Sequence, residues 1–334
     1  MLILGIESSC DETGAAVIKG NKNSESVFLL SNVIATSLAM HSTTGGIIPE
    51  NAAREQVKFI IPVISDALDK AGIKPQDLDA IAVTHGPGLI GSLLIGVETA
   101  KILSYVWNKP LIPTNHLIGH LYANWIEANP DLPAIGLIVS GGHTDLVLIK
   151  QHEKLEWLGG TRDDAAGEAL DKIGRLLGLP YPGGPNIEKR AKEGDPKKYN
   201  FPTPLNDSSF DFSFSGLKSA VLREVIDKKL SEQTVNDICA NVQKVIIGIL
   251  IKKTLKAAEK YGVKSIILGG GVAANQTLRN ELKSSLESKP KGVKLFVPEK
   301  YLCTDNAAMI ATAAFYNHRV INWKKVDADP GLYF

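Results

Sequence analysis

Two segments of this chain share a pattern that ordinary β-hairpins lack. Residues 2–18 read LILGIESSCDETGAAVI, and residues 134–150 read AIGLIVSGGHTDLVLIK. In each segment, two apolar runs flank a short polar turn that contains serine beside cysteine, glycine, histidine or aspartate. Tight hairpins usually turn at Asn-Gly or Gly-Gly pairs instead. Because each segment opens one half of the chain, and each half continues with helices and a further β/α segment, the sequence predicts a duplicated α/β unit.

The alternation of patterns along the chain also indicates an α/β protein. Short runs rich in valine, isoleucine and leucine predict strands, and longer amphipathic stretches predict helices. The longest predicted helix covers 232–261, where apolar residues recur with a 3.6-residue period. We expect strands at 2–7, 13–19, 79–84, 134–139, 144–149, 264–268 and 293–297, and helices at about 51–71, 91–107, 115–128, 163–177, 216–228, 232–261 and 305–317.

Composition limits the class of protein. With 334 residues, 44% of them hydrophobic, the chain can bury a large core and is expected to form two domains. Its 37 basic and 36 acidic residues exclude a strongly basic nucleic-acid-binding protein but allow a local basic patch. The three cysteines are far apart in sequence, the N-terminus lacks a basic signal-peptide region, and apolar runs such as 245–251 are short. We expect a cytoplasmic protein that does not contact a membrane.

A duplicated α/β unit headed by polar hairpins resembles actin, the sugar kinases and the heat-shock chaperone ATPases. That resemblance implies a two-lobed fold with a central cleft, in which the two hairpins hold the phosphates of a nucleotide. Backbone N–H groups in a tight turn of small residues form an anion-binding concavity. We expect a first lobe from residues 1–133 plus 306–334, and a second lobe from 134–305 with a helical insertion at about 160–235.

Two further segments are candidates for nucleotide contacts. The loop in LGGGVAANQTLRNEL, at 268–282, lies between a predicted strand and a helix, and its three glycines let the backbone approach a ligand. An ordinary βα turn needs only one glycine, so we favour a ligand loop, although the dinucleotide fingerprint is absent. Asp171, near a rigid Pro-Gly-Gly turn, is a candidate acceptor for ribose hydroxyls.

A histidine pair is the candidate metal site. His116 and His120 are four residues apart, on one face of a predicted helix, and can bind one metal. Two hydrogen-bonded histidines near a helix start would explain the pair equally well. The metalloprotease signature needs glutamate directly after the first histidine, and Leu117 stands there, so a peptidase is not favoured. Asp305, at the head of the last predicted helix, is a plausible third ligand.

Taken together, nine motifs resemble those of the TsaD family of tRNA N6-adenosine threonylcarbamoyltransferases, formerly described as O-sialoglycoprotein endopeptidases. His143 in VSGGHT is similar to the bacterial branch of that family. The motifs occur in order between residues 5 and 312: GIESSCDETGAAV, GGIIPE, THGPGLIGSLLIG, NHLIGH, VSGGHT, DDAAGEALDKIGRLLGLPYPGGP, FSFSGLKSA, GGGVAAN and TDNAAMIA.

The resemblance implies an activity and a set of site residues. The activity is transfer of a threonylcarbamoyl group from threonylcarbamoyl-adenylate to N6 of the adenosine just 3′ of the anticodon in ANN-decoding tRNAs, with release of AMP. His116, His120 and Asp305 match the family's ligands for one divalent metal, expected to be iron, with zinc or magnesium as alternatives. The positions that match the adenylate-binding residues are Ile138, Val139, Ser140, Gly141, Gly142, Asp171, Gly184, Glu188 and Asn275.

The first hairpin is expected to face the reacting acyl phosphate, across the cleft from residues 138–143. A metal at the phosphate and carbonyl oxygens would polarise the carbonyl group of the donor. The exocyclic amine of adenosine is a poor nucleophile, so activating the electrophile matters more than a strong base. Asp11 and Glu12, in the first hairpin, are the candidates for that base.

The chain departs from the family pattern at three positions, and the resemblance also implies partners. Ile118 stands where the family commonly has glutamate, and Asn51 and Gln56 replace leucine and histidine. None of these three residues is an expected metal ligand. We expect the changes to affect contacts with a partner or with tRNA near residues 49–56. The implied partners are tRNA, the catalytically inactive paralogue TsaB, the small ATPase TsaE and a separate adenylate synthase.

Two other functions remain as alternatives. A small-molecule kinase with the actin-like fold would bind ATP with magnesium, but it would leave the histidine pair without a function. A non-catalytic scaffold similar to the family's degenerate paralogue would predict decayed metal and nucleotide motifs. Those motifs are intact in this sequence, so we favour the transferase.

Overall fold

The structure is a computed structural model that describes residues 1–21, 25–37, 46–287 and 292–334. The chain divides into two compact units, one formed by residues 1–130 with 298–334 and the other by 131–297. Residues 298–305 belong to the first compact unit, whereas the expected lobes placed them in the second. The division into two functional lobes remains a prediction, and the two units are described separately below.

The first unit contains a five-stranded sheet in the order β3-β2-β1-β4-β5. The central strand β1 runs antiparallel to β2 and parallel to β4, which is in turn parallel to β5. As a result, the carboxyl ends of β1, β4 and β5 lie at the same edge of the sheet. The strands are β1 (Leu2–Glu7), β2 (Glu12–Asn21), β3 (Ser26–Thr36), β4 (Ala80–Gly86) and β5 (Leu111–Asn115).

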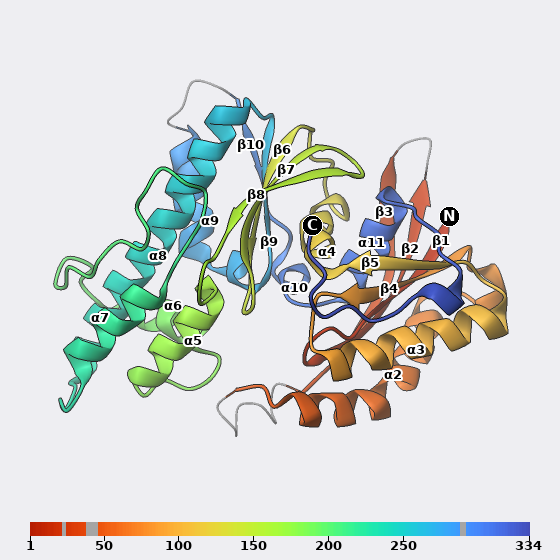
Figure 1. The fold of residues 1–334 in the computed structure, drawn as a ribbon, viewed down its shortest axis with the longest axis horizontal. Helices are drawn as coiled ribbons and strands as arrows, with labels where there is room; N and C mark the ends of the chain where they lie inside the picture. The colour runs from red at the N-terminus through yellow and green to blue at the C-terminus, as the bar shows by residue number, and fades with distance from the viewer. Residues whose placement is uncertain (22–24, 38–45, 288–291) are drawn as a thin grey trace. The chain divides into compact units, whose positions relative to one another are not determined.

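Helices cover both faces of this sheet (Figure 1). Helix α11 (Ala307–Tyr316) packs on one face, in a core that includes Ile3, and is apolar on all sides because it is buried on all sides. Helices α2 (Pro49–Ala71) and α3 (Ile90–Trp107) cover the other face, in a core that includes Leu4. Because both faces are covered, β1 is a continuous apolar run up to its last residue.

The second unit repeats this topology. Its sheet has the order β10-β9-β6-β7-β8, with β6 antiparallel to β7 and parallel to β9. Read from β8, this is the order and the set of directions found from β3 in the first sheet, so the predicted duplication is confirmed. The strands are β6 (Ala134–Val139), β7 (Thr144–Gln151), β8 (Lys154–Gly160), β9 (Ser265–Gly269) and β10 (Lys294–Phe296).

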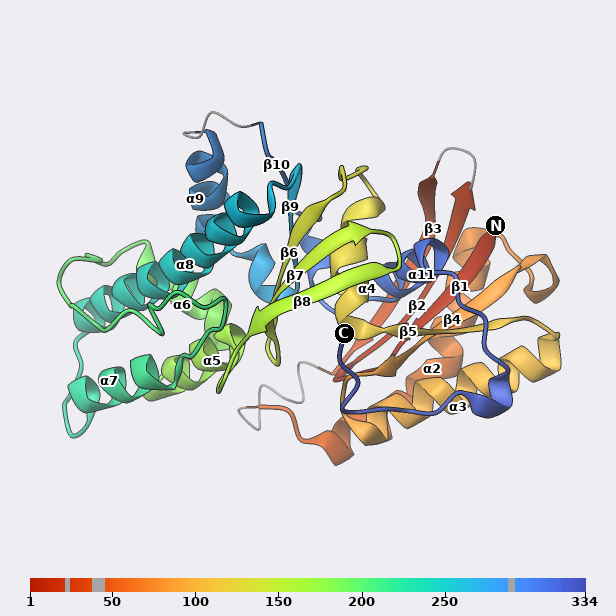
Figure 2. The same ribbon diagram turned by 45° about the horizontal axis from the view of Figure 1, so that its top comes forward.

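The second unit carries a helical segment between β8 and the end of its longest helix. Helix α6 packs against both α5 and α8 (Figure 2). The segment spans the residues of the expected insertion at about 160–235, and its being an insertion stays a prediction. The remaining helices of the two units are α4 (His116–Tyr122), α5 (Ala166–Leu176), α6 (Gly183–Ala191), α7 (Ser215–Val225), α8 (Glu232–Tyr261), α9 (Gln276–Glu287) and α10 (Lys300–Cys303).

Several elements differ from the sequence-based expectation. Strands β3, β5 and β8 and helices α6 and α10 were not predicted, and the predicted helix at 115–128 ends at Tyr122 and continues as a 3-10 turn over Ala123–Trp125. Strand β3 does not alternate regularly because a β-bulge interrupts its pairing with β2 between Val17 and Ile18. Strand β8 lies at a sheet edge and is largely exposed, so it lacks the apolar pattern of a buried strand.

Two helices, α3 and α8, are long and apolar enough to cross a membrane by length and composition alone. Core helices meet the same test. In α8, 67% of the apolar stretch is buried within the structure, and in α3 33% is buried. The expected cytoplasmic location stays a prediction.

Candidate functional site

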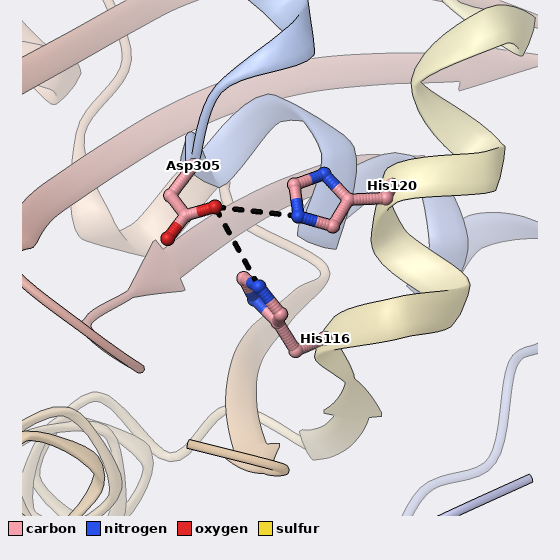
Figure 3. A group of neighbouring side chains, drawn as sticks. All are labelled: His116, His120 and Asp305. Atoms are coloured by element: carbon pink, nitrogen blue, oxygen red, sulfur yellow. Dashed lines mark ion pairs between the residues drawn. The ribbon is translucent and has the colours of Figure 1, made fainter. Parts of the chain in front are cut away.

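The three predicted metal ligands lie together in the first unit. Strand β5 ends at Asn115, whose side-chain oxygen accepts hydrogen bonds from the N–H groups of Leu117 (2.8 Å) and Ile118 (3.2 Å) and so starts helix α4. One turn apart on α4, His116 and His120 both point at Asp305 (Figure 3). The Nε2 atoms of His116 and His120 lie 3.5 and 3.3 Å from the same oxygen, Asp305 Oδ1.

This geometry suits a divalent transition metal. The ligand atoms of a tetrahedral zinc ion, each at about 2.0–2.1 Å from it, lie roughly 3.4 Å from one another. Both ring nitrogens of His120 are buried: Nδ1 has no hydrogen-bond partner among the residues that the structure describes, and Nε2 faces Asp305 Oδ1 at 3.3 Å. A buried polar group without a partner costs about 1–3 kcal/mol. The two Nε2 atoms and the Asp305 carboxylate face one another, and two imidazole nitrogens with one carboxylate oxygen are a donor set that would hold such a metal.

Glu7, the last residue of β1, fixes the orientation of His116. Its carboxylate is completely buried and lies 3.1 Å from His116 Nδ1. Thr84 Oγ1 donates to Oε2 at 2.5 Å, and the N–H of Ser9 donates to Oε1 at 2.6 Å. A carboxylate that binds one ring nitrogen leaves the other nitrogen facing the metal. The parallel order β1-β4-β5 brings Glu7, Thr84 and His116 to one edge of the sheet.

Glu7 and His116 each stabilise the charged form of the other. Burial would raise the pKa of Glu7, but the charge of His116 and the hydrogen bonds from His116 and Ser9 lower the pKa below its usual value. Burial would likewise lower the pKa of His116, yet Glu7 and Asp305 raise it to about 9. Sequence analysis did not identify Glu7. The available signal was a carboxylate at the end of an otherwise apolar strand.

The first hairpin places the predicted catalytic residues next to this cluster. A carboxylate oxygen of Asp11, the thiol of Cys10 and an oxygen of Asp305 lie within 4.8 Å of one another. Glu12 begins β2, and its Oε1 accepts a hydrogen bond from Thr36 Oγ1 at 2.8 Å. Burial raises the pKa of Glu12 to about 7, helped by the charges of Asp11 and Asp305 and opposed by the Thr36 hydrogen bond.

The second hairpin contains five of the predicted adenylate-binding residues. Ile138 and Val139 end β6, and because their side chains are completely buried only their backbone atoms are available to a ligand. Ser140 closes the turn on itself: its N–H donates to the carbonyl of His143 at 2.9 Å, and its Oγ accepts from the N–H of His143 at 3.1 Å. Gly141 and Gly142 form the exposed tip of the turn.

Asp171 and Gly184 are brought together by the turn that starts α6. The carboxylate of Asp171 accepts hydrogen bonds from the N–H of Gly183, at 2.7 Å, and from the N–H of Gly184. Burial raises the pKa of Asp171, and these two hydrogen bonds oppose the rise. Asp171 therefore holds the Pro-Gly-Gly turn in place, and its predicted contact with ribose stays a prediction.

Glu188 and Asn275 meet at the start of α9. Glu188 Oε1 accepts from the N–H of Gln276 at 2.9 Å, and Asn275 Oδ1 accepts from the N–H of Leu278 at 3.0 Å. The preceding loop turns back at Gly270, where φ is 92° and a side chain would collide with the carbonyl of Val139. The glycine-rich loop therefore lies directly against the second hairpin, at the carboxyl ends of β6 and β9.

The sequence also matches known proteins over most of its length. The model of the TsaD family, described as tRNA N6-adenosine threonylcarbamoyltransferase, matches residues 28–312. A protein of that name from Moorella thermoacetica is 51% identical over 321 residues, which cover 95% of this chain and 92% of the relative. Its counterpart from Symbiobacterium thermophilum is 49% identical over 335 residues, which cover 99% and 96%, respectively.

Solved structures support the predicted actin-like α/β fold class. The structure of HypF from T. kodakarensis matches with a TM-score of 0.64 at 15% identity, and the match covers 94% of this chain and 47% of HypF. Component A of (R)-2-hydroxyglutaryl-CoA dehydratase from Acidaminococcus fermentans has a TM-score of 0.54 at 17% identity, over 93% and 96%. These likenesses concern the fold alone. The sequence matches identify the family: this chain belongs to the TsaD family of tRNA N6-adenosine threonylcarbamoyltransferases.

Proposed function

We propose that this protein transfers a threonylcarbamoyl group from threonylcarbamoyl-adenylate to N6 of the adenosine 3′ of the anticodon in ANN-decoding tRNAs. Family membership supports acyl transfer to an adenosine of tRNA. The metal-assisted reaction is supported by one observation: His116, His120 and Asp305 converge beside the polar hairpin of the first unit.

The reaction forms one bond and breaks another. N6 of adenosine attacks the carbamoyl carbon, and the bond from that carbon to the phosphate oxygen breaks. AMP leaves with the electron pair, and N6 gives up one proton, so that a urea linkage joins threonine to the base. The site must therefore stabilise negative charge on the leaving phosphate and accept one proton.

His116, His120 and Asp305 would hold a divalent metal, which we expect to be iron, with zinc or magnesium as alternatives. When bound there, the metal supplies Lewis acidity toward the oxygens of the acyl phosphate. With a metal bound, Glu7 would accept the Nδ1–H of His116 and so leave the lone pair of Nε2 for the metal, and the burial of Glu7 keeps water away from that hydrogen bond.

Glu12 is the residue that we assign to proton acceptance. A pKa of about 7 lets a carboxylate exchange a proton near neutral pH. Asp11, the other predicted catalytic residue, contributes to that raised pKa and lies close to Asp305. The N–H of Ser9 donates to Glu7, and the other N–H groups of the turn at residues 8–12 are suited to stabilise negative charge on the donor.

The second unit would bind the adenylate. In this proposal the N–H groups of the turn at 140–142 contact the phosphate, and Asp171 and Glu188 accept from the ribose hydroxyls. Adenine would lie along the loop at 268–275, next to Gly184. The exposed Gly141 and Gly142 and the absence of side chains at the glycine-rich loop support close approach of a ligand to the backbone.

The remaining parts of the proposal concern organisation and partners. We propose that the two lobes expected from the sequence form the functional halves, and that the protein acts in the cytoplasm with TsaB and TsaE. A separate synthase would supply the adenylate. Membership of the family supports tRNA as the acceptor substrate.

A reconstituted transfer assay tests this function. The protein, TsaB, TsaE, threonylcarbamoyl-adenylate and unmodified ANN-decoding tRNA are combined, and the nucleosides are analysed by mass spectrometry. We expect threonylcarbamoyladenosine with the wild type and with the His318→Ala control, and none with His116→Ala or after chelation. Failure of the metal-loaded wild type to form product, despite tight adenylate binding, would contradict the proposal and favour a scaffold.

A further inference from the structure

The side chain of Gln56 contacts three backbone carbonyls of the first hairpin turn. Gln56 is on α2 and is 1% exposed. Its amide nitrogen Nε2 lies 2.9 Å from the carbonyl oxygen of Glu12, 3.2 Å from that of Cys10 and 3.3 Å from that of Ser8. Three alternate carbonyl groups of the turn therefore converge on one amide.

The carbonyl groups between these three are also bound by the protein. The N–H of Leu89 donates to the carbonyl of Ser9 at 2.7 Å, and Ser37 Oγ donates to that of Asp11 at 2.6 Å. Every peptide carbonyl from Ser8 to Glu12 thus accepts a hydrogen bond. Because the C=O and N–H of a trans peptide point in opposite directions, the N–H groups of Ser9, Asp11 and Thr13 point away from Gln56, and that of Ser9 donates to Glu7 Oε1.

The amide of Gln56 acts here as a donor. With the amide reversed, Oε1 would face three carbonyl oxygens, and no hydrogen would lie between them. In the orientation present, Oε1 is buried without a hydrogen-bond partner among the residues described, so the side chain's polar contacts are those of Nε2. Two N–H bonds are shared among three acceptors. Ser92 Oγ also donates to the carbonyl of Cys10, at 2.8 Å, so removing the amide would release the carbonyls of Ser8 and Glu12.

We propose that Gln56 is a positioning residue for the transfer reaction, which holds the turn at residues 8–12 so that its N–H groups and Glu12 meet the substrate. This inference rests on the proposed function. Gln56 contacts backbone carbonyls and acts only through the turn. A displacement of about 1 Å of such a group can cost roughly 100-fold in rate.

The test compares two substitutions at this position with one control. Gln56→Met keeps the length and apolar character of the side chain and removes both N–H bonds. Gln56→His keeps a ring N–H at similar reach. The control is Ser31→Ala: Ser31 Oγ is buried, donates to the carbonyl of Ala67 at 2.7 Å and accepts from the N–H of Val17 at 3.3 Å. Ser31 thus joins β3 to α2 at Ala67, which lies eleven residues after Gln56 on the same helix.

The transfer assay gives kcat and KM for tRNA, expressed per bound metal, with the thermal midpoint measured beside them. We expect Gln56→Met to lower kcat by about 30–100-fold with KM for tRNA within about 3-fold, and Gln56→His to recover most of that loss. Ser31→Ala should lower the thermal midpoint and leave kcat unchanged. A Gln56→Met protein with kcat within about 3-fold of an active wild type would overturn the inference, and so would an equal loss of kcat in Ser31→Ala.

Hydrogen exchange separates failure of this inference from failure of the proposed function. If the wild type makes no product, the proposed function fails, and the peptide that covers residues 7–14 still reports on the turn. We expect its amides to exchange faster in Gln56→Met than in the wild type or in Ser31→Ala. Equal exchange in all three proteins would show that Gln56 does not hold the turn.

Discussion

The two hairpins of this protein share their backbone plan and differ in their chemistry. Both join the first two strands of five-stranded sheets with the same order and directions. The turn between β1 and β2 is flanked by Glu7 and Glu12, carries Asp11, and is bound from behind by Gln56. The turn between β6 and β7 is closed by hydrogen bonds between Ser140 and His143, is bound by the N–H of Gly167, and ends in two exposed glycines.

Under the proposed function, we expect the first unit of the duplicated fold to supply the reacting groups and the second unit to bind the adenylate. The carboxylates and histidines in the first unit are suited to stabilise charge and to transfer protons. Small residues in the second unit leave the backbone open to a ligand and add little charge of their own. The account therefore predicts that substitutions near the first turn change the chemical step, whereas substitutions near the second change substrate affinity.

The largest effect is expected from the metal ligands. His116→Ala should lower transfer by at least about 1000-fold, because it removes one of the three proposed ligands and leaves Glu7 buried without its charged partner. Product formation and metal content are measured on the same sample. If His116→Ala keeps its activity although it has lost the metal, the reaction does not depend on this cluster. The proposed difference between the two turns would then be wrong.

Glu7→Gln should have the next largest effect. An amide at this position no longer fixes His116 as a carboxylate does, and loss of such a partner typically lowers metal affinity by about 10–100-fold. Competition with a metal chelator measures the affinity. Thr114→Ala, which alters a side chain of β5 outside the cluster, serves as the control. An unchanged affinity in Glu7→Gln would mean that His116 is oriented by other contacts.

In the second unit, Asp171→Asn should raise KM for the adenylate by about 10-fold with kcat nearly unchanged. The amide oxygen can still accept from the N–H of Gly183, so the turn is retained while the negative charge is lost. Steady-state kinetics with varied adenylate separate KM from kcat. A loss confined to kcat would place Asp171 with the reacting groups and contradict the division of tasks.

The smallest effect concerns the pH dependence of stability. The pKa of Glu12 is raised from 4.5 to about 7, so the folded state binds this proton more tightly than the unfolded state. Stability is lost as the pH rises from 4.5 to 7, and the ionised carboxylate costs about 1–2 kcal/mol above pH 7, allowing for its partial exposure.

Glu12→Gln should remove this cost. We expect the free energy of unfolding of Glu12→Gln to exceed that of the wild type at pH 8 and to match it at pH 4.5, measured by urea denaturation. Asp66→Asn, a surface substitution on α2, is the control. An equal difference between wild type and Glu12→Gln at both pH values would show that Glu12 has an ordinary pKa.

Patterns within single elements were predictable from the sequence. Strands β1 and β6 and helix α8 have the expected bounds, since each is a long buried or periodic run. Strand β5 was missed because it has five residues and includes Pro113. The unusual polar turns at the heads of two similar halves were enough to predict the duplication, which the sheet topology confirms.

Contacts between distant segments were not predictable in the same way. The spacing of His116 and His120 indicated a shared helix face, whereas Glu7 joins them only because β1 and β5 flank β4 in the sheet. Gln56 stood out in the sequence as a departure from the family pattern. Its contacts with the turn, 44 to 48 residues away, depend on how α2 packs on the sheet.

The most direct measurement of the central claim is product formed per bound metal. Metal is titrated into metal-free protein in the reconstituted assay, and metal content and threonylcarbamoyladenosine are measured in each sample. The account predicts that product formation rises in proportion to occupancy, up to one metal per chain, and stays absent at every point in a His116→Ala/His120→Ala protein. Full product formation by metal-free wild type, or by that double variant, would contradict it.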